Sequence, residues 1–197
     1  MILYHMSQKL MPGDLLLPDG QNCRELCEPF VQALEYSKDC FCGMVLNAKY
    51  MYAVLNKLHI REWTNYAKWA TEEVFEYIRQ KEFPECVSRM KCVYYYDDLA
   101  YSKKLYCEAW SDKPEEERKK LHLFEVVVDD EQLNRRDMSL YDAAYDVLSG
   151  KQDLNTVIDF ARRYFTGKQS DNPIWEYLSD SSAKITRDIT FVLQDIV

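Results

Sequence analysis

His5 is one of three histidines in the chain and lies in the segment LYHMSQ of residues 3–8. The aromatic and apolar neighbours of His5 favour a short strand. A neutral imidazole offers one donor and one acceptor nitrogen, so such a histidine can bind a hydroxyl group of a ligand. It can equally be a packed strand residue with a purely structural hydrogen bond. The local sequence leaves both interpretations open.

Three consecutive tyrosines, Tyr94 to Tyr96, stand in the segment CVYYY of residues 92–96, which is also typical of a strand. Because successive side chains on a strand point to opposite faces, Tyr94 and Tyr96 are expected to share one face. Adjacent aromatic residues on a strand usually pack in the core or against a neighbouring strand. An aromatic face can also stack on a planar ligand ring.

Two carboxylates, Glu176 and Asp180, precede the last strand-like segment. A carboxylate can lower a reaction barrier by stabilising positive charge that develops in the substrate. It can also take a proton from an attacking group. The alternative for Glu176 is an ordinary surface residue on a short helix, and Asp180 is the competing acid.

Several familiar motifs are missing from the sequence. It contains neither of the glycine-rich phosphate loops, G-x-G-x-x-G and G-x-x-x-x-G-K-[ST], and neither G-x-S-x-G nor H-E-x-x-H. Rossmann and P-loop enzymes, nucleophile-elbow hydrolases and zincins are therefore not favoured. Cys23-x3-Cys27 and Cys40-x-Cys42 lack the two-residue spacing of strong zinc motifs, so we expect no metal site.

The composition indicates a folded protein rather than a disordered one. The 197 residues are 47% hydrophobic and 29% charged, and the formal net charge is -8. An acidic chain is a poor match for a nucleic-acid backbone, so nucleic acid is not favoured as a partner. No apolar run is long enough to span a bilayer and no secretion signal is recognised. Seven irregularly spaced cysteines are typical of reduced thiols, so we expect a cytoplasmic protein without a membrane partner.

The order of the expected elements indicates an α+β fold. Residues 61–80 have a helical apolar stripe, and residues 121–128 alternate as a strand. Residues 139–150 and 153–167 read as helices, with Ser139 and Asp153 as N-caps and glycines at their ends. Alternating apolar residues from Ile185 to Phe191 predict a final strand. The connections between strands are too irregular for a doubly wound sheet.

Several segments, taken in order, resemble the ADP-ribosyltransferases of the diphtheria-toxin and poly(ADP-ribose) polymerase branch. LYHMSQ resembles the first-strand signature of that branch, and LYHMSQKLMPGDLL is similar to the start of rifampicin ADP-ribosyltransferases. CVYYYDDLAYSKKLY resembles the strand and helix that follow, with Ser102 eight residues after Tyr94. LHLFEVVV resembles the next strand, and WEYLSDSSAKITRDI the place where an acidic residue precedes the final strand. Residues 76–89 are also similar to an E-x-x-R-x-x-x-x-P…S-R segment of uncharacterised bacterial proteins.

The resemblance implies a single domain over residues 1–197, with two small antiparallel sheets around a cleft and a helical insertion at about residues 22–85. It predicts that His5 and Tyr94 lie within about 15 Å, a few strand spacings. Trp63, Tyr66 and Trp69 should be at least partly buried. It implies NAD as a substrate, with the catalytic residues Glu176, Tyr94 and His5 and the NAD-binding residues His5, Ser7, Tyr94, Tyr96 and Ser102.

In this scheme His5 binds the ribose, Tyr94 stacks on the nicotinamide, Ser102 binds its carboxamide and Glu176 is the acidic group. The expected activity is mono-ADP-ribosyl transfer from NAD to an unknown protein or small-molecule acceptor, with release of nicotinamide. Met6 stands where the family has a glycine that lets the backbone approach the ligand. A degenerate transferase fold that only binds a partner, and an unrelated α+β structural protein, are the alternatives.

Overall fold

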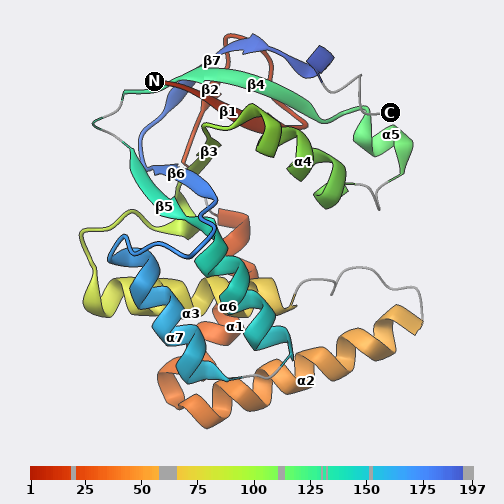
Figure 1. The fold of residues 1–197 in the computed structure, drawn as a ribbon. Coiled ribbons are helices and arrows are strands. Elements are labelled where there is room, and N and C mark those ends of the chain that lie inside the picture. Colours follow the sequence, from red (N-terminus) through yellow and green to blue (C-terminus); the bar gives the residue numbers. More distant parts are fainter. Residues whose placement is uncertain are drawn as a thin grey trace. The chain divides into compact units, whose positions relative to one another are not determined.

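The structure is a computed structural model, which describes residues 1–18, 21–57, 66–110, 114–129, 131, 133–150 and 153–192. The chain forms two compact units (Figure 1). The sheet unit contains Met1–Asp19, Cys92–Arg135 and Trp175–Val197. The helical unit contains Gly20–Lys91 and Arg136–Ile174. The mixed α and β character predicted from the sequence is confirmed.

The strands form one seven-stranded sheet in the order β2-β7-β4-β1-β3-β6-β5. Their bounds are β1 Ile2–Ser7, β2 Leu15–Leu16, β3 Val93–Tyr96, β4 His122–Val127, β5 Asn134–Asp137, β6 Trp175–Ser179 and β7 Ala183–Asp188. The expected two small sheets are therefore wrong as a description of this structure. The physical reason is that β1 pairs along both edges, with β4 on one side and β3 on the other, so no break divides the sheet. The boundary between the two units falls inside β5.

The register of the strands assigns each side chain to one of two sheet faces, because directly paired residues share a face. Tyr4 pairs with Tyr96, which pairs with Glu176. His5 pairs with Phe124 and therefore lies on the face opposite to Tyr4. We call the two sides the His5 face and the Tyr94 face; Tyr94 lies two residues before Tyr96 and shares its face.

The main apolar core of the sheet unit lies on the His5 face. Its buried members include Leu3, Leu16, Val93, Tyr95, Phe124, Val126, Tyr177 and Ile185. The Tyr94 face has a smaller cluster around Leu123 and Ile189, against which Leu99 packs. Leu99 begins helix α4, Leu99–Trp110, and the short helix α5, Glu115–Arg118, precedes β4.

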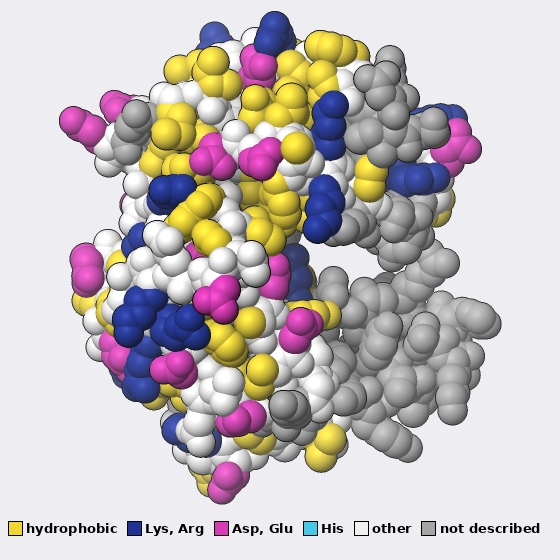
Figure 2. Space-filling model, viewed as in Figure 1, with side chains coloured by type: hydrophobic (Ala, Val, Ile, Leu, Met, Phe, Trp, Pro, Cys, Tyr) yellow, Lys and Arg dark blue, Asp and Glu magenta, His cyan; other side chains and the backbone are white. Residues whose placement is uncertain are grey.

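Part of the sheet unit remains apolar at its surface. Ile2 and Val127 pair in register and are 58% and 57% exposed. Figure 2 shows hydrophobic side chains gathered on the surface of the sheet unit, among scattered charged residues. Burial is therefore far from complete along β1 and β4, even though both are interior strands of the sheet.

The helical unit is built from α1 Gln21–Tyr36, α2 Lys38–Lys57, α3 Tyr66–Glu82, the 3-10 turn η2 Arg89–Lys91, α6 Met138–Gly150 and α7 Leu154–Phe165. Its core is aromatic: Phe75 packs edge-on against Tyr141 and Tyr164, at 5.3 and 5.4 Å between ring centroids. Helix α3 is described from Tyr66, and residues 61–65 of the predicted helix lie outside the described residues. Trp69 is half-buried as predicted, whereas Trp63 and the side chain of Tyr66 also fall outside them.

The predicted helix caps are partly confirmed. Asp153 caps α7, since its carboxylate accepts hydrogen bonds from the backbone N–H groups of Asn155 and Thr156. Ser139 was expected to cap α6, but this prediction is wrong. Asp137 takes that place, and its Oδ1 accepts from the backbone N–H of Ser139 at 3.0 Å. The carboxylate one residue before the helix reaches the exposed amides of its first turn.

Residues 76–89 of the helical unit form a network of hydrogen bonds between the end of α3 and the turn that follows it. Glu76 accepts a bidentate pair of hydrogen bonds from Arg79, at 2.9 and 2.8 Å, and another from Ser88 at 2.8 Å. Arg79 also donates to the carbonyl oxygens of Pro84 and Cys86. Burial alone would raise the pKa of Glu76, but the bonds from Arg79, Gln80 and Ser88 lower it overall. These contacts hold the turn after α3 against the end of the helix, which gives the residues of this segment a structural role.

Candidate functional site

A cavity of about 380 Å³ lies within the sheet unit, on the part of the sheet that carries His5. Its walls are mostly aliphatic, because the segment after β1 supplies four leucines. The lining residues are His5, Leu10, Leu15, Leu16, Leu17, Cys92, Val93 and Tyr94. A cavity with aliphatic walls and few polar groups is typical of a small-molecule site. His5 is the lining side chain with the clearest capacity for polar recognition.

The two nitrogens of His5 have different roles. Nδ1 lies 2.9 Å from the carbonyl oxygen of Tyr94 on the neighbouring strand. A carbonyl oxygen can only accept, so Nδ1 carries the hydrogen in this bond. Burial lowers the pKa of His5, although its bond to Tyr94 opposes this in part, so the neutral ring is favoured. Nε2 is then a lone-pair acceptor, and it has no hydrogen-bond partner among the described residues.

Tyr95 provides a second polar group on the His5 face. Its ring is fully buried and meets the His5 ring edge-on, with centroids 6.1 Å apart. Its hydroxyl is buried and has no hydrogen-bond partner within the described part of the chain. Burial, together with nearby Cys92, raises the pKa of Tyr95 to about 12, so the hydroxyl keeps its proton and is a donor. An orphaned buried hydroxyl costs free energy unless a ligand or water pairs with it.

The other predicted site residues lie on the Tyr94 face. Tyr94 and Tyr96 share this face, as alternation predicts, and Tyr96 packs against Tyr101 of α4 with ring centroids 5.3 Å apart. Ser102, also on α4, is buried, and its hydroxyl donates to the carbonyl oxygen of Asp98 at 2.9 Å. Glu176 pairs with Tyr96 across β3 and β6. The side chains of this group therefore lie on the face opposite to His5, although Tyr94 also lines the cavity and its carbonyl oxygen bonds to His5.

Glu176 is a buried strand residue, so the alternative of a surface position on a short helix is wrong. It lies in β6 and is 1% exposed. The segment WEYLS alternates aromatic and polar residues, and its pairing with the tyrosines of β3 makes it a strand rather than a helix. Asp180, the competing acid, is exposed directly after β6. Neither carboxylate lines the cavity at His5.

Ser7 and Met6 lie near His5 in the chain but differ in direction. Ser7 lies two residues after His5 on β1 and therefore shares its face, and its hydroxyl accepts from the backbone N–H of Lys9 at 3.3 Å. Met6 packs on the Tyr94 face with Leu123 and Tyr4. The side chain of Met6, which stands at the position of the family's glycine, thus points away from the cavity.

Sequence reasoning brought His5 and Tyr94 together through their strands but missed much of the cavity. The leucines of residues 10–17, which line the cavity, were not singled out as site residues, and neither was Tyr95, which packs against His5 without lining the cavity. An alternating pattern shows that Tyr95 opposes Tyr94, but only the pairing of β1 with β3 shows that Tyr95 shares a face with His5. That pairing joins segments that are distant in the sequence, and no local signal specifies it.

The structure is thus a mixed α and β protein with a cavity beside His5 on one sheet face. Residues 5–191 match the family model described as "Protein of unknown function (DUF2441)", and the chain belongs to this family. No curated protein matches the sequence. Within the described ranges, none of the helices combines the length and the apolar character needed to cross a bilayer.

Proposed function

We propose that the protein binds NAD at the His5 cavity and transfers its ADP-ribosyl group to a protein or small-molecule acceptor, within an ADP-ribosyltransferase-like fold. The observation that carries the proposal is the pairing of two unused polar groups on the His5 face. His5 lines a cavity with aliphatic walls, and its Nε2 is an acceptor. The Tyr95 hydroxyl is a donor and is buried near His5, outside the residues that line the cavity. A sugar diol supplies the matching donor and acceptor.

The reaction breaks the bond between the anomeric ribose carbon and the nicotinamide nitrogen. The bonding electron pair leaves with nicotinamide, and the ribose carries positive charge until the acceptor oxygen or nitrogen attacks and loses its proton. The role proposed for His5 is to hold the ribose by accepting from a hydroxyl. The sequence resemblance favours Glu176 as the acidic residue and Tyr94, Tyr96, Ser7 and Ser102 as the other NAD-binding residues. Ser7 shares the His5 face. The side chains of the other four lie on the Tyr94 face, so their assignment rests on the resemblance and not on the cavity.

Two substitutions of His5 separate its structural bond from its ligand bond. His5→Asn keeps an amide N–H near the position of Nδ1 and can still donate to Tyr94 O, but it removes the acceptor at Nε2. His5→Gln places an oxygen near Nε2 and loses the Nδ1 bond. We expect calorimetric titration with NAD to show about 10-fold weaker binding for His5→Asn, the value of one good hydrogen bond. His5→Gln should bind more tightly than His5→Asn although it unfolds more easily.

Equal NAD affinity in the wild type and both variants would contradict a ribose contact at His5. Absence of any heat or thermal shift with millimolar NAD would contradict the proposed function itself. A ligand that binds only the folded state stabilises it by about 2.7 kcal/mol at a hundredfold excess over Kd.

The position of Glu176 supports a second candidate, a degenerate fold that binds its ligand without turnover. Its carboxylate is buried on the face opposite to His5. Nicotinamide release into water distinguishes the two candidates. An enzyme that uses Glu176 should lose at least about 10-fold of this release in Glu176→Gln and keep NAD binding. Release lost in Asp180→Asn instead would assign the acid to Asp180, and binding without release would favour the degenerate fold.

A further inference from the structure

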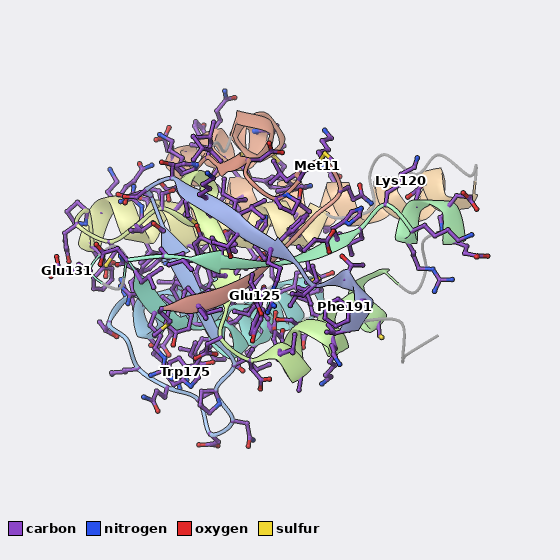
Figure 3. The ribbon with its side chains drawn as sticks, turned by 90° about the horizontal axis from the view of Figure 1, so that it is seen from above. Met11, Lys120, Glu125, Glu131, Trp175 and Phe191 are labelled. Carbon is purple, nitrogen blue, oxygen red and sulfur yellow. The ribbon has the colours of Figure 1, made fainter. Side chains whose placement is uncertain are left out.

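Three neighbouring strands present an acid, a histidine and a serine in a row on the His5 face. Asp188 ends β7, His122 begins β4 and Ser7 ends β1, and these strands are adjacent in the order β7-β4-β1. Phe124 pairs with both His5 and Asp188, and Ser7 pairs with His122, so all three residues share the His5 face. Lys120, just before β4, and Phe191, just after β7, mark this end of the strands in Figure 3.

We propose that Ser7, His122 and Asp188 form an acyl-transfer site, in which Ser7 is the nucleophile, His122 the general base and Asp188 the residue that orients the histidine. The site goes beyond the proposed NAD chemistry: none of the three residues lines the His5 cavity, and His122 and Asp188 have no part in that chemistry. Ser7 is also a proposed NAD-binding residue, but its role as a nucleophile does not depend on that assignment. A nucleophile, a base and an orienting carboxylate in sequence are the arrangement that acyl transfer needs.

The base is held in a defined orientation. His122 Nδ1 lies 2.8 Å from Asp188 Oδ2, so Nδ1 carries the hydrogen and Nε2 is the acceptor in the neutral ring. The other oxygen of Asp188 accepts from the backbone N–H of Thr190 at 2.8 Å and from its hydroxyl. The His122 ring stacks on Phe124, at 5.9 Å and 15° between the rings. Burial raises the pKa of Asp188, but the bonds from Thr190 and His122 lower it overall, so its charge is retained.

Strand order places the free edge of the imidazole toward the serine. Nδ1 faces β7 through Asp188, and Ser7 belongs to β1 on the other side of β4. Directly paired residues have Cβ atoms about 4.5–5.5 Å apart, which a serine rotamer can bridge toward a histidine. No hydrogen bond joins Ser7 and His122, both of which belong to the described part of the chain. Catalytic hydrogen bonds are commonly longer in a ligand-free site and tighten on binding.

The setting favours small, activated oxyesters as substrates. The side chains of His122 and Asp188 are 40% and 33% exposed, so a compact ester can reach them from solvent. Ser7 Oγ bonds to the acyl carbon while His122 Nε2 takes the serine proton. The bond between the acyl carbon and the alcohol oxygen then breaks, and the alcohol leaves with that proton. Water releases the carboxylic acid and restores Ser7.

Covalent labelling tests the site without knowledge of its natural substrate. The full chain is incubated with a fluorophosphonate ester, whose phosphorus bonds to an activated serine oxygen as fluoride leaves. We expect one adduct per chain by intact mass, located at Ser7 by peptide mapping. Ser7→Ala should abolish it, while Ser181→Ala, a matched serine in the turn after β6, should leave it unchanged. His122→Phe keeps an aromatic ring on Phe124 and should slow labelling at least about 100-fold, as expected for loss of a general base.

Asp188 acts through His122 and is a positioning residue, so its test needs more than loss of reactivity. Asp188→Asn should slow labelling at least about 10-fold, and Asp188→Glu should restore part of the rate with the same melting temperature as Asp188→Asn. Absence of an adduct on the folded wild type, labelling that persists in Ser7→Ala, or labelling at Ser7 that is unchanged in His122→Phe would overturn the proposal.

Discussion

Tyr95→Phe is a substitution for which the proposed site predicts opposite effects on stability and on ligand binding. It removes one oxygen atom from a fully buried ring and leaves the packing on the His5 face unchanged. The hydroxyl has no hydrogen-bond partner among the described residues, so its burial destabilises the folded, ligand-free protein. A buried unsatisfied group of this kind costs about 1–3 kcal/mol. We therefore expect the ligand-free variant to be more stable by an amount in that range.

Urea unfolding measures this gain directly. With a slope of about 1–3 kcal/mol per molar urea, the midpoint should rise by on the order of 1 M. The melting temperature should rise by about 2–4 °C for each kcal/mol. NAD affinity should fall by about 2- to 10-fold, the value of one hydrogen bond to the ligand. Tyr36→Phe, which removes the hydroxyl of an exposed tyrosine in α1 outside the proposed site, is the control for loss of a tyrosine hydroxyl.

A ligand-free Tyr95→Phe protein that is no more stable than the wild type would refute this reasoning. Such a result would mean that the hydroxyl has a partner, such as ordered water, in solution. A more stable variant with unchanged NAD affinity would support the unsatisfied hydroxyl but contradict its contact with NAD. The hydroxyl would then be orphaned but would not contact NAD.

Two further predictions concern charge. Arg89→Met should lower the free energy of unfolding of the helical unit by about 3–5 kcal/mol in urea titrations, because it leaves Glu72 buried without the bidentate bonds from Arg89. Adding Glu72→Met should recover much of the loss. An Arg89→Met variant as stable as the wild type would contradict this account. Because burial lowers the pKa of folded His5, the unfolded chain takes up the proton first. The stability that neutral His5 provides is complete above about pH 6.5 and should be lost on acidification below it, by at most about 1.4 kcal/mol per pH unit. His5→Asn should remove this component, and an unchanged pH profile between pH 6.5 and 5 would argue against it.

Local patterns predicted individual elements well where short-range chemistry decides them. Asp153 was predicted as the cap of α7 from its position alone, and the alternation of Tyr94 and Tyr96 holds on β3. The last strand was predicted to reach Phe191, but β7 ends at Asp188. The Asp188 carboxylate accepts from the backbone N–H of Thr190 and turns the chain, which a pattern of apolar residues does not reveal.

Long-range register limited the prediction of the candidate site. The sequence shows that Tyr94 and Tyr95 point in opposite directions, but not which of them faces His5. The pair of Tyr4 with Tyr96 decides this, and it depends on how the whole sheet assembles. The His122 ring stacks on Phe124 of the same strand. Its bond to Asp188 joins two strands whose pairing no local signal specifies.

The interleaved order of the strands has a consequence for folding during synthesis. β1 leaves the ribosome before its partners β3 and β4, as the pair of Leu3 with Val126 illustrates, and β7 must still add to β4. Pairings between distant segments form slowly, and an unpaired apolar strand can associate with other chains meanwhile. Neighbouring helices α1, α2 and α3 contact one another and can assemble earlier. The yield of folded protein should therefore depend on the time for which β1 stays unpaired before β4 is synthesised. Slower growth at low temperature should reduce aggregation without any change in the stability of the folded sheet.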